Sequence, residues 1–153
     1  MIKKKKKPVE KGIYEIGIYD WRVDFSFREN FSRYLRFKGD FDEYSSLILV
    51  GTISHPVLKK AKRAEIHILE TPQLDDHWKE NPPEDIRSSA GSMQTLRDGY
   101  TLCFFSYLPP RIFRNVLASV ASDKIRTAMV FGTKLKWGRG LIFRIGFSTI
   151  REE

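Results

Sequence analysis

Alternation of apolar and polar residues is the feature that most constrains how this chain folds. Successive side chains of a β-strand point to opposite faces, so a period of two is typical of strands with one buried face. The stretches that show it best are residues 13–18, 23–27, 31–41, 64–68 and 125–149. We expect a fold dominated by β-strands.

Two further runs, residues 47–53 and 100–108, are apolar on both faces and are predicted to be central strands. Asp98-Gly99 precedes the second run and predicts a hairpin with a type I′ turn, which needs positive φ at both central residues. A glycine-containing turn over residues 137–140 is predicted to join the strands of a final hairpin. On its returning strand, the residues expected to share one face are Leu141, Phe143, Ile145, Phe147 and Thr149.

One segment has helical periodicity instead. Its apolar positions form a single stripe and comprise Ile112, Phe113, Val116, Leu117, Val120 and Ala121. Pro110 suits the first turn of a helix, where its missing N–H costs nothing. The sequence therefore predicts an amphipathic helix over residues 110–122 that links two strands and covers part of a sheet.

These elements define the expected fold class. The chain has 153 residues, which fits one domain, and 41% of them are hydrophobic. About nine strands and one helix predict a mainly β (α+β) fold with an antiparallel-rich sheet, either a β-sandwich or an open sheet. We expect a disordered basic arm over residues 1–11, and a single β-rich domain over 12–153 with a flexible acidic loop at 71–90.

Charge is distributed unevenly along the chain. The net charge is +8, with +5 over residues 1–11, −5 over 70–86 and +6 over 111–153. Clustered charge of this kind makes a directed electrostatic field. No apolar run approaches the ~20 residues of a membrane span, and no signal peptide follows the basic start. We expect a cytoplasmic protein.

The last predicted hairpin turn gathers the best candidate polyanion-binding residues. These are Lys134, Lys136, Trp137, Arg139 and Arg144. Basic residues beside an exposed aromatic ring can hold phosphates and stack a base. Alternatively, the charges protect a sheet edge, and Trp137 packs inward with the parity of Phe131 and Leu135. The five lysines of residues 3–7 have similar alternatives: binding to nucleic acid, an anionic membrane surface or an acidic partner, or a solvated tail.

No residues are predicted to be catalytic or to bind a metal. His55, His67 and His77 are the chain's histidines, and no two of them stand at a metal-ligand spacing. Ser54 and His55 are adjacent, so in a strand they point to opposite faces and cannot form a dyad. Cys103 lies in an apolar run, where burial raises a thiol pKa and makes it inert. No glycine-rich phosphate loop is present, and no cofactor is expected.

These observations rank three functions. A non-enzymatic binding or interaction module with a protein partner is the leading hypothesis. The alternative is a β domain that binds nucleic acid or another polyanion through the basic arm and the last hairpin. An enzyme whose site is assembled from scattered residues ranks third, because no positioned nucleophile or metal set is visible. The sequence specifies no oligomeric state.

Overall fold

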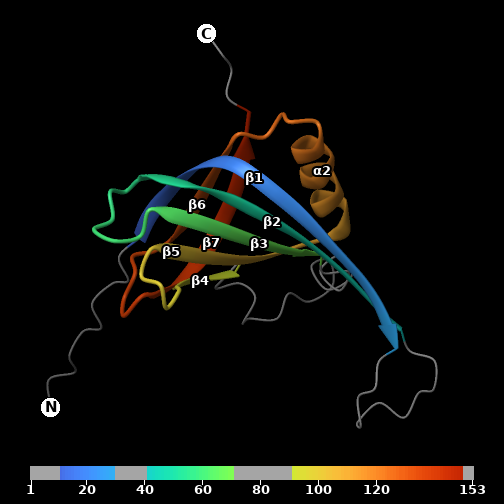
Figure 1. The fold of residues 1–153 in the computed structure, drawn as a ribbon, viewed down its shortest axis with the longest axis horizontal. Helices are drawn as coiled ribbons and strands as arrows, with labels where there is room; N and C mark the ends of the chain where they lie inside the picture. The colour runs from blue at the N-terminus through green and yellow to red at the C-terminus, as the bar shows by residue number, and fades with distance from the viewer. Residues whose placement is uncertain (1–10, 30–40, 71–90, 150–153) are drawn as a thin grey trace, which may run out of the picture.

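The computed structural model describes residues 11–29, 41–70 and 91–149 (Figure 1). Its elements are β1 (Lys11–Glu29), β2 (Phe41–His55), β3 (Arg63–Glu70), β4 (Gly91–Thr95), β5 (Thr101–Leu108), α2 (Pro110–Ala121), β6 (Thr127–Thr133) and β7 (Arg139–Ser148). No helix within these ranges is long and apolar enough to span a membrane. The predicted arm at 1–10, the alternation at 31–40 and the acidic loop at 71–90 lie outside the described residues. β1 begins at Lys11, the last residue assigned to the arm.

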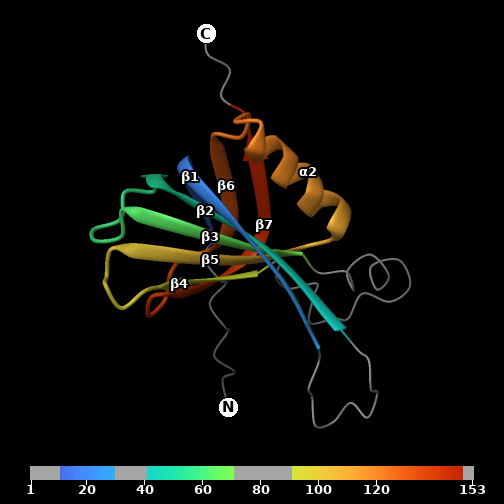
Figure 2. The same ribbon diagram turned by 45° about the vertical axis from the view of Figure 1, so that its right-hand side comes forward.

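The strands form one closed barrel in the order β1-β2-β3-β5-β4-β7-β6, and β6 pairs back onto β1 (Figures 1 and 2). Every neighbouring pair is antiparallel except β3 and β5, which run parallel. The prediction of a β-sandwich or an open sheet is therefore wrong. Alternation shows which face of a strand is buried, but it does not show whether the first and last edges of the sheet meet.

The long strand β1 explains how the barrel closes. Its first part, residues 11–17, pairs with β6, and residues 15–29 pair with β2. Pairing with β2 is interrupted between Glu15 and Ile16 and again around Tyr19, and such bulges bend a strand and increase its twist. The two strands predicted over 13–18 and 23–27 are thus one strand with a bulge between them. Trp21, beyond the bulge, pairs with the buried Leu49.

The barrel interior holds the core, and α2 adds to it. The largest fully buried side chains include Phe104, Ile16, Leu49, Ile66, Met93, Val130 and Ile142. The predicted helix is confirmed over Pro110–Ala121, and Phe113, Val116 and Val120 are its buried residues. It joins the end of β5 to the start of β6, so it packs at the right-hand end of the barrel in Figure 1. This end is opposite the β2–β3 and β4–β5 connections.

One predicted turn type and one predicted face need correction. The hairpin at Asp98-Gly99 is present, but of these two residues only Gly99 has positive φ, so the turn is not type I′. The final hairpin is also present as β6 and β7. However, Gly132 pairs with Ile142 and Phe131 with Arg144, which leaves Phe143 in a bulge. Ile142 is therefore buried while Phe143 is exposed, and the predicted single apolar face is broken.

Candidate functional site

Three strand connections meet at one end of the barrel. They are the β2–β3 connection at 56–62, the β4–β5 connection at 96–100 and the β6–β7 turn at 134–138, seen at the left of Figure 1. The register explains this meeting, because Arg63 at the start of β3 pairs with Thr101, and Arg139 at the start of β7 pairs with Gln94. We call residues 12–14, 55–63, 95–101 and 133–139 the basic rim.

Backbone hydrogen bonds join these connections to one another. The carbonyl oxygen of Tyr100 accepts from the N–H groups of Lys62 and Arg63, at 3.0 and 3.1 Å. The N–H of Thr95 donates to the carbonyl oxygen of Gly138 at 2.7 Å. These bonds satisfy the backbone groups of the connections and fix the spacing between their side chains. The basic rim is therefore a built surface and not a set of independent loops.

The charge on this surface is of one sign over two of the three connections. The β2–β3 connection carries the exposed Lys59, Lys60 and Lys62 and no acidic residue. The β6–β7 turn and the first residue of β7 supply Lys134, Lys136 and Arg139, again with no acid between them. Like charges held close together by the fold give a concentrated positive potential. This is the kind of surface that attracts a polyanion.

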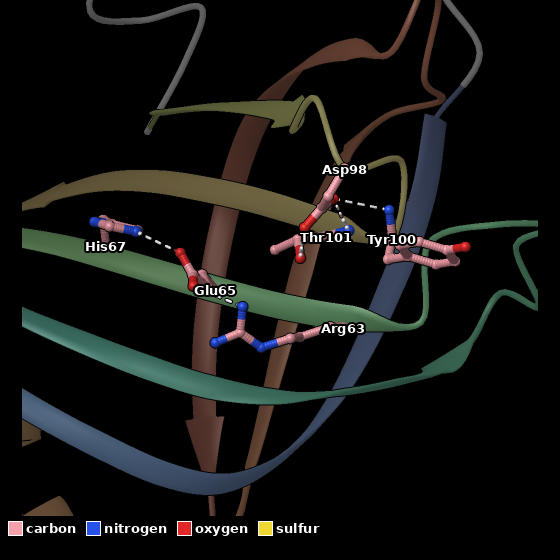
Figure 3. Close-up of polar contacts among 6 residues, drawn as sticks. All are labelled: Arg63, Glu65, His67, Asp98, Tyr100 and Thr101. Carbon is pink, nitrogen blue, oxygen red and sulfur yellow. Dashed lines mark hydrogen bonds and ion pairs between the residues drawn. The ribbon is translucent and has the colours of Figure 1, made fainter.

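The acid of the third connection is engaged within its own turn (Figure 3). Oδ1 of Asp98 accepts from the N–H groups of Tyr100 and Thr101 at 2.8 and 2.9 Å, and Oδ2 accepts from the Thr101 hydroxyl at 2.8 Å. The bonds from Thr101, with that from Tyr100 after them, lower the pKa of Asp98 below its ordinary value. This carboxylate therefore shapes the β4–β5 turn.

Exposed aromatic rings stand among these charges. Trp137 is 91% exposed, and both it and Gly138 have positive φ, at 57° and 72°. At that exposure the indole does not pack into the barrel, so the alternative in which Trp137 packs inward is wrong. Tyr100, on the β4–β5 connection, is 68% exposed. An amphipathic ring left in water beside lysines is a stacking surface for a planar ligand.

A groove of about 640 Å³ opens beside the β6–β7 turn. Its lining residues are Gly12, Ile13, Tyr14, His55, Pro56, Leu58, Lys134 and Leu135. The floor is rigid at Tyr14, whose hydroxyl donates to the carbonyl oxygen of Thr133 at 3.0 Å and whose pKa is raised by burial. Most of the lining is apolar, with a lysine and a histidine among the lining residues. The volume lies within the range of about 300–1,000 Å³ typical of small-molecule pockets.

The structure brings together four of the five predicted polyanion-binding residues. Lys134, Lys136, Trp137 and Arg139 all lie on the basic rim. Arg144 does not, because it lies within β7 with its guanidinium 5.2 Å from the centre of the Phe131 ring. Sequence reasoning missed Lys59, Lys60 and Lys62. Their signal was an acid-free lysine run between two strands, but nothing in the sequence placed that run beside the last hairpin.

A second polar cluster lies on the outer wall of the barrel, on β3 and β5, and Figure 3 shows its members on β3. Glu65 has Oε1 at 2.9 Å from Nη1 of Arg63 and Oε2 at 3.3 Å from Nε2 of His67. Cys103 pairs in register with Glu65 and is buried, as predicted. Burial, with a smaller effect of the Glu65 charge, raises the pKa of the Cys103 thiol to about 12. No pattern in the sequence predicts this contact, because Cys103 is distant from His67 along the chain.

Comparisons with known proteins add nothing to this geometry: no family model, no curated protein and no solved structure matches the chain.

Proposed function

We propose that the basic rim binds single-stranded nucleic acid. The observation that carries this proposal is the convergence of two acid-free basic connections on one barrel end, with the exposed Trp137 between Lys136 and Arg139 in one of them. The sequence alone favoured a protein partner, because no base-reading motif accompanies the basic residues. Their juxtaposition changes the order of the hypotheses.

Each part of the rim has a role in this proposal. Lys59, Lys60, Lys134 and Lys136 contact backbone phosphates, which supplies most of the affinity and releases counterions. Trp137 stacks one base. The groove beside Lys134 receives a neighbouring base, whose edges reach His55. Stacking on a side chain requires a base that is not already stacked between its neighbours, so the rim favours a single strand over a duplex.

Salt dependence of binding tests the proposal. The wild-type chain is titrated into labelled oligothymidylate and oligouridylate at several salt concentrations, and the log–log slope gives about −0.7 for each phosphate contact. We expect Lys59→Ala with Lys134→Ala to reduce the slope by about 0.7 per lost contact. The matched control is Arg111→Ala with Lys124→Ala, which removes the same charge from exposed positions at the opposite end of the barrel.

The outcomes separate the rim from net charge. A smaller slope for the rim pair and an unchanged slope for the control pair support the proposal. Equal effects of the two pairs would show that only the overall charge matters. Undetectable binding at about 50 mM salt, where phosphate contacts are strong, would return the protein-interaction hypothesis to first place.

A further inference from the structure

The cluster on the outer wall of β3 and β5 has the composition of a metal site. Parallel pairing sets Glu65 beside Cys103, and His67 follows two residues after Glu65 on the same face of β3. One ligand atom from each of these three residues lies within 4.8 Å of the other two. The cluster takes no part in the proposed nucleic-acid binding, since its three members belong to the barrel wall.

We propose that Glu65, His67 and Cys103 bind a zinc ion. Thiolate, imidazole and carboxylate are the three ligand types that proteins offer to zinc. Calcium and magnesium prefer all-oxygen sites, so a thiol and an imidazole argue against them. Three protein ligands with a fourth position left for water is the arrangement of open zinc sites, in contrast to closed structural ones.

The separation between His67 and Glu65 agrees with tetrahedral zinc. Zn–N and Zn–O bonds of about 2.0–2.2 Å at a tetrahedral angle separate the nitrogen from the oxygen by about 3.4 Å. His67 Nε2 and Glu65 Oε2 are 3.3 Å apart, which is longer than the common hydrogen-bond length. A Zn–S bond of about 2.3 Å requires the sulfur about 3.6 Å from each of these atoms. The sulfur lies within 4.8 Å of both atoms, so zinc binding requires side-chain movements that close a gap of at most about 1.2 Å.

Neighbouring side chains hold the ligands in place. The Arg63 guanidinium binds Oε1 of Glu65 and leaves Oε2 toward His67, so it orients the carboxylate for binding through one oxygen. The His67 ring lies against Phe105, with ring centres 5.1 Å apart at an angle of 34°. The side chains of Glu65 and His67 are 22% and 24% exposed, which gives an ion access from solvent.

Cys103 is protonated before metal binding and must lose its proton to the solvent. It is 2% exposed and faces the Glu65 carboxylate, and both conditions disfavour a thiolate. A divalent cation reverses them, because it neutralises the carboxylate and bonds directly to the sulfur, which then loses its proton. The zinc replaces one proton on sulfur, and no oxidant or reductant is required.

Zinc and cobalt titrations test the site. The full chain is freed of metal with a chelator and titrated with zinc by calorimetry, then with Co²⁺, whose tetrahedral thiolate complexes absorb strongly in the visible and near ultraviolet. We expect one zinc per chain and a sulfur-to-cobalt charge-transfer band. Cys103→Ser and His67→Gln each weaken zinc binding by more than about 100-fold, beyond the effect of losing an outer-shell partner. Cys103→Ser also abolishes the charge-transfer band.

His55, at the end of β2, supplies the control. His55→Gln keeps the wild-type zinc affinity and the cobalt spectrum. If Cys103→Ser fails to fold in the presence of chelator, His67→Gln carries the test, since its side chain is partly exposed. Zinc binding that survives both Cys103→Ser and His67→Gln, or the absence of one-to-one binding by the wild-type chain, overturns the proposal. Neither result bears on binding to the basic rim.

Discussion

Gly51 on β2 lies directly against the backbone of Gly17 on β1: a Cβ atom built on Gly51 would be 2.3 Å from the carbonyl oxygen of Gly17 and 2.7 Å from a methyl group of Ile16. The residues stand beside the bulge at which β1 changes its register with β2. The barrel therefore needs a residue without a side chain at position 51, where the backbone of β1 lies too close for a Cβ atom.

Gly51→Ala should destabilise the protein. The added methyl meets backbone atoms, which cannot move aside without disturbing the pairing of β1 with β2, and overpacking of this kind costs about 1–3 kcal/mol. Gly146→Ala is the matched control, because it also lies in a strand but a Cβ there meets nothing within 4 Å. Urea unfolding of both variants gives the comparison. Equal stabilities of Gly51→Ala and Gly146→Ala would mean that the backbones of β1 and β2 do not approach closely at position 51.

The sequence predicts individual strands and the helix of this fold, but not the closure of the barrel. Alternation and helical periodicity located most of the strands and α2, because both patterns are local. Closure depends on the pairing of β6 with the first residues of β1, far apart in sequence, and no local pattern records it. Bulges also escape the local pattern, because they add a residue within a single strand. The extra residue at Phe143 moved the inward position to Ile142, which a strict period of two does not allow.

Phe113→Ala should cost about 3–5 kcal/mol of unfolding free energy, because it empties the largest buried position of α2. Ile112→Ala, on the adjacent position, should change the stability by less than about 1 kcal/mol, since Ile112 is 44% exposed and alanine favours helix. Denaturant titration monitored by circular dichroism checks both. Similar losses in the two variants would show that α2 does not seal the barrel end through Phe113.

Asp98→Asn should lower the melting temperature at neutral pH, and this difference from the wild type should disappear in acid. The folded pKa of Asp98 lies below its ordinary value, so the charged carboxylate stabilises the turn fully above about pH 4, and this stabilisation falls as the pH drops through the folded pKa. The gap in melting temperature between wild type and Asp98→Asn should be constant from pH 5 to 7 and shrink below about pH 4.

Asp24→Asn serves as the control for this experiment, because Asp24 is an exposed carboxylate on β1 away from the turn. Its melting temperature should follow that of the wild type over the whole range. A gap for Asp98→Asn that persists unchanged at pH 2 would mean that the amide change perturbs the turn by itself, without a contribution from the charge.

The candidate interface was predictable only in part, for the same reason as the fold. The basic residues of the β6–β7 turn lie close in sequence to an aromatic residue, so the sequence alone identifies them as candidates: Lys134, Lys136, Trp137 and Arg139. The lysines of the β2–β3 connection join them only through strand order, because β1 pairs with β2 on one side and with β6 on the other in the closed barrel. Arg144 shows the opposite error: it is near the turn in the sequence, but the strand carries it away from the rim.

Replacement of Trp137 tests the stacking role separately from the charge. Asparagine is the appropriate substitute, because φ at this position is 57° and asparagine tolerates that region better than alanine. Trp137→Asn should weaken binding to a single-stranded oligonucleotide by about 5- to 150-fold, the equivalent of about 1–3 kcal/mol for one stacked base. The salt slope should stay unchanged, because stacking releases no counterions. Trp137→Phe should retain most of the affinity, since it keeps an aromatic face.

Heparin distinguishes stacking from a general loss of positive potential, because it offers negative charge without bases. Trp137→Asn and the wild-type chain should bind heparin equally, whereas Lys59→Ala with Lys134→Ala should bind it more weakly. If Trp137→Asn weakens heparin and oligonucleotide binding by the same factor, the indole supports the turn and does not contact a base. The basic rim would then be a general polyanion site, with its lysines as the recognition element and Trp137 as part of the scaffold.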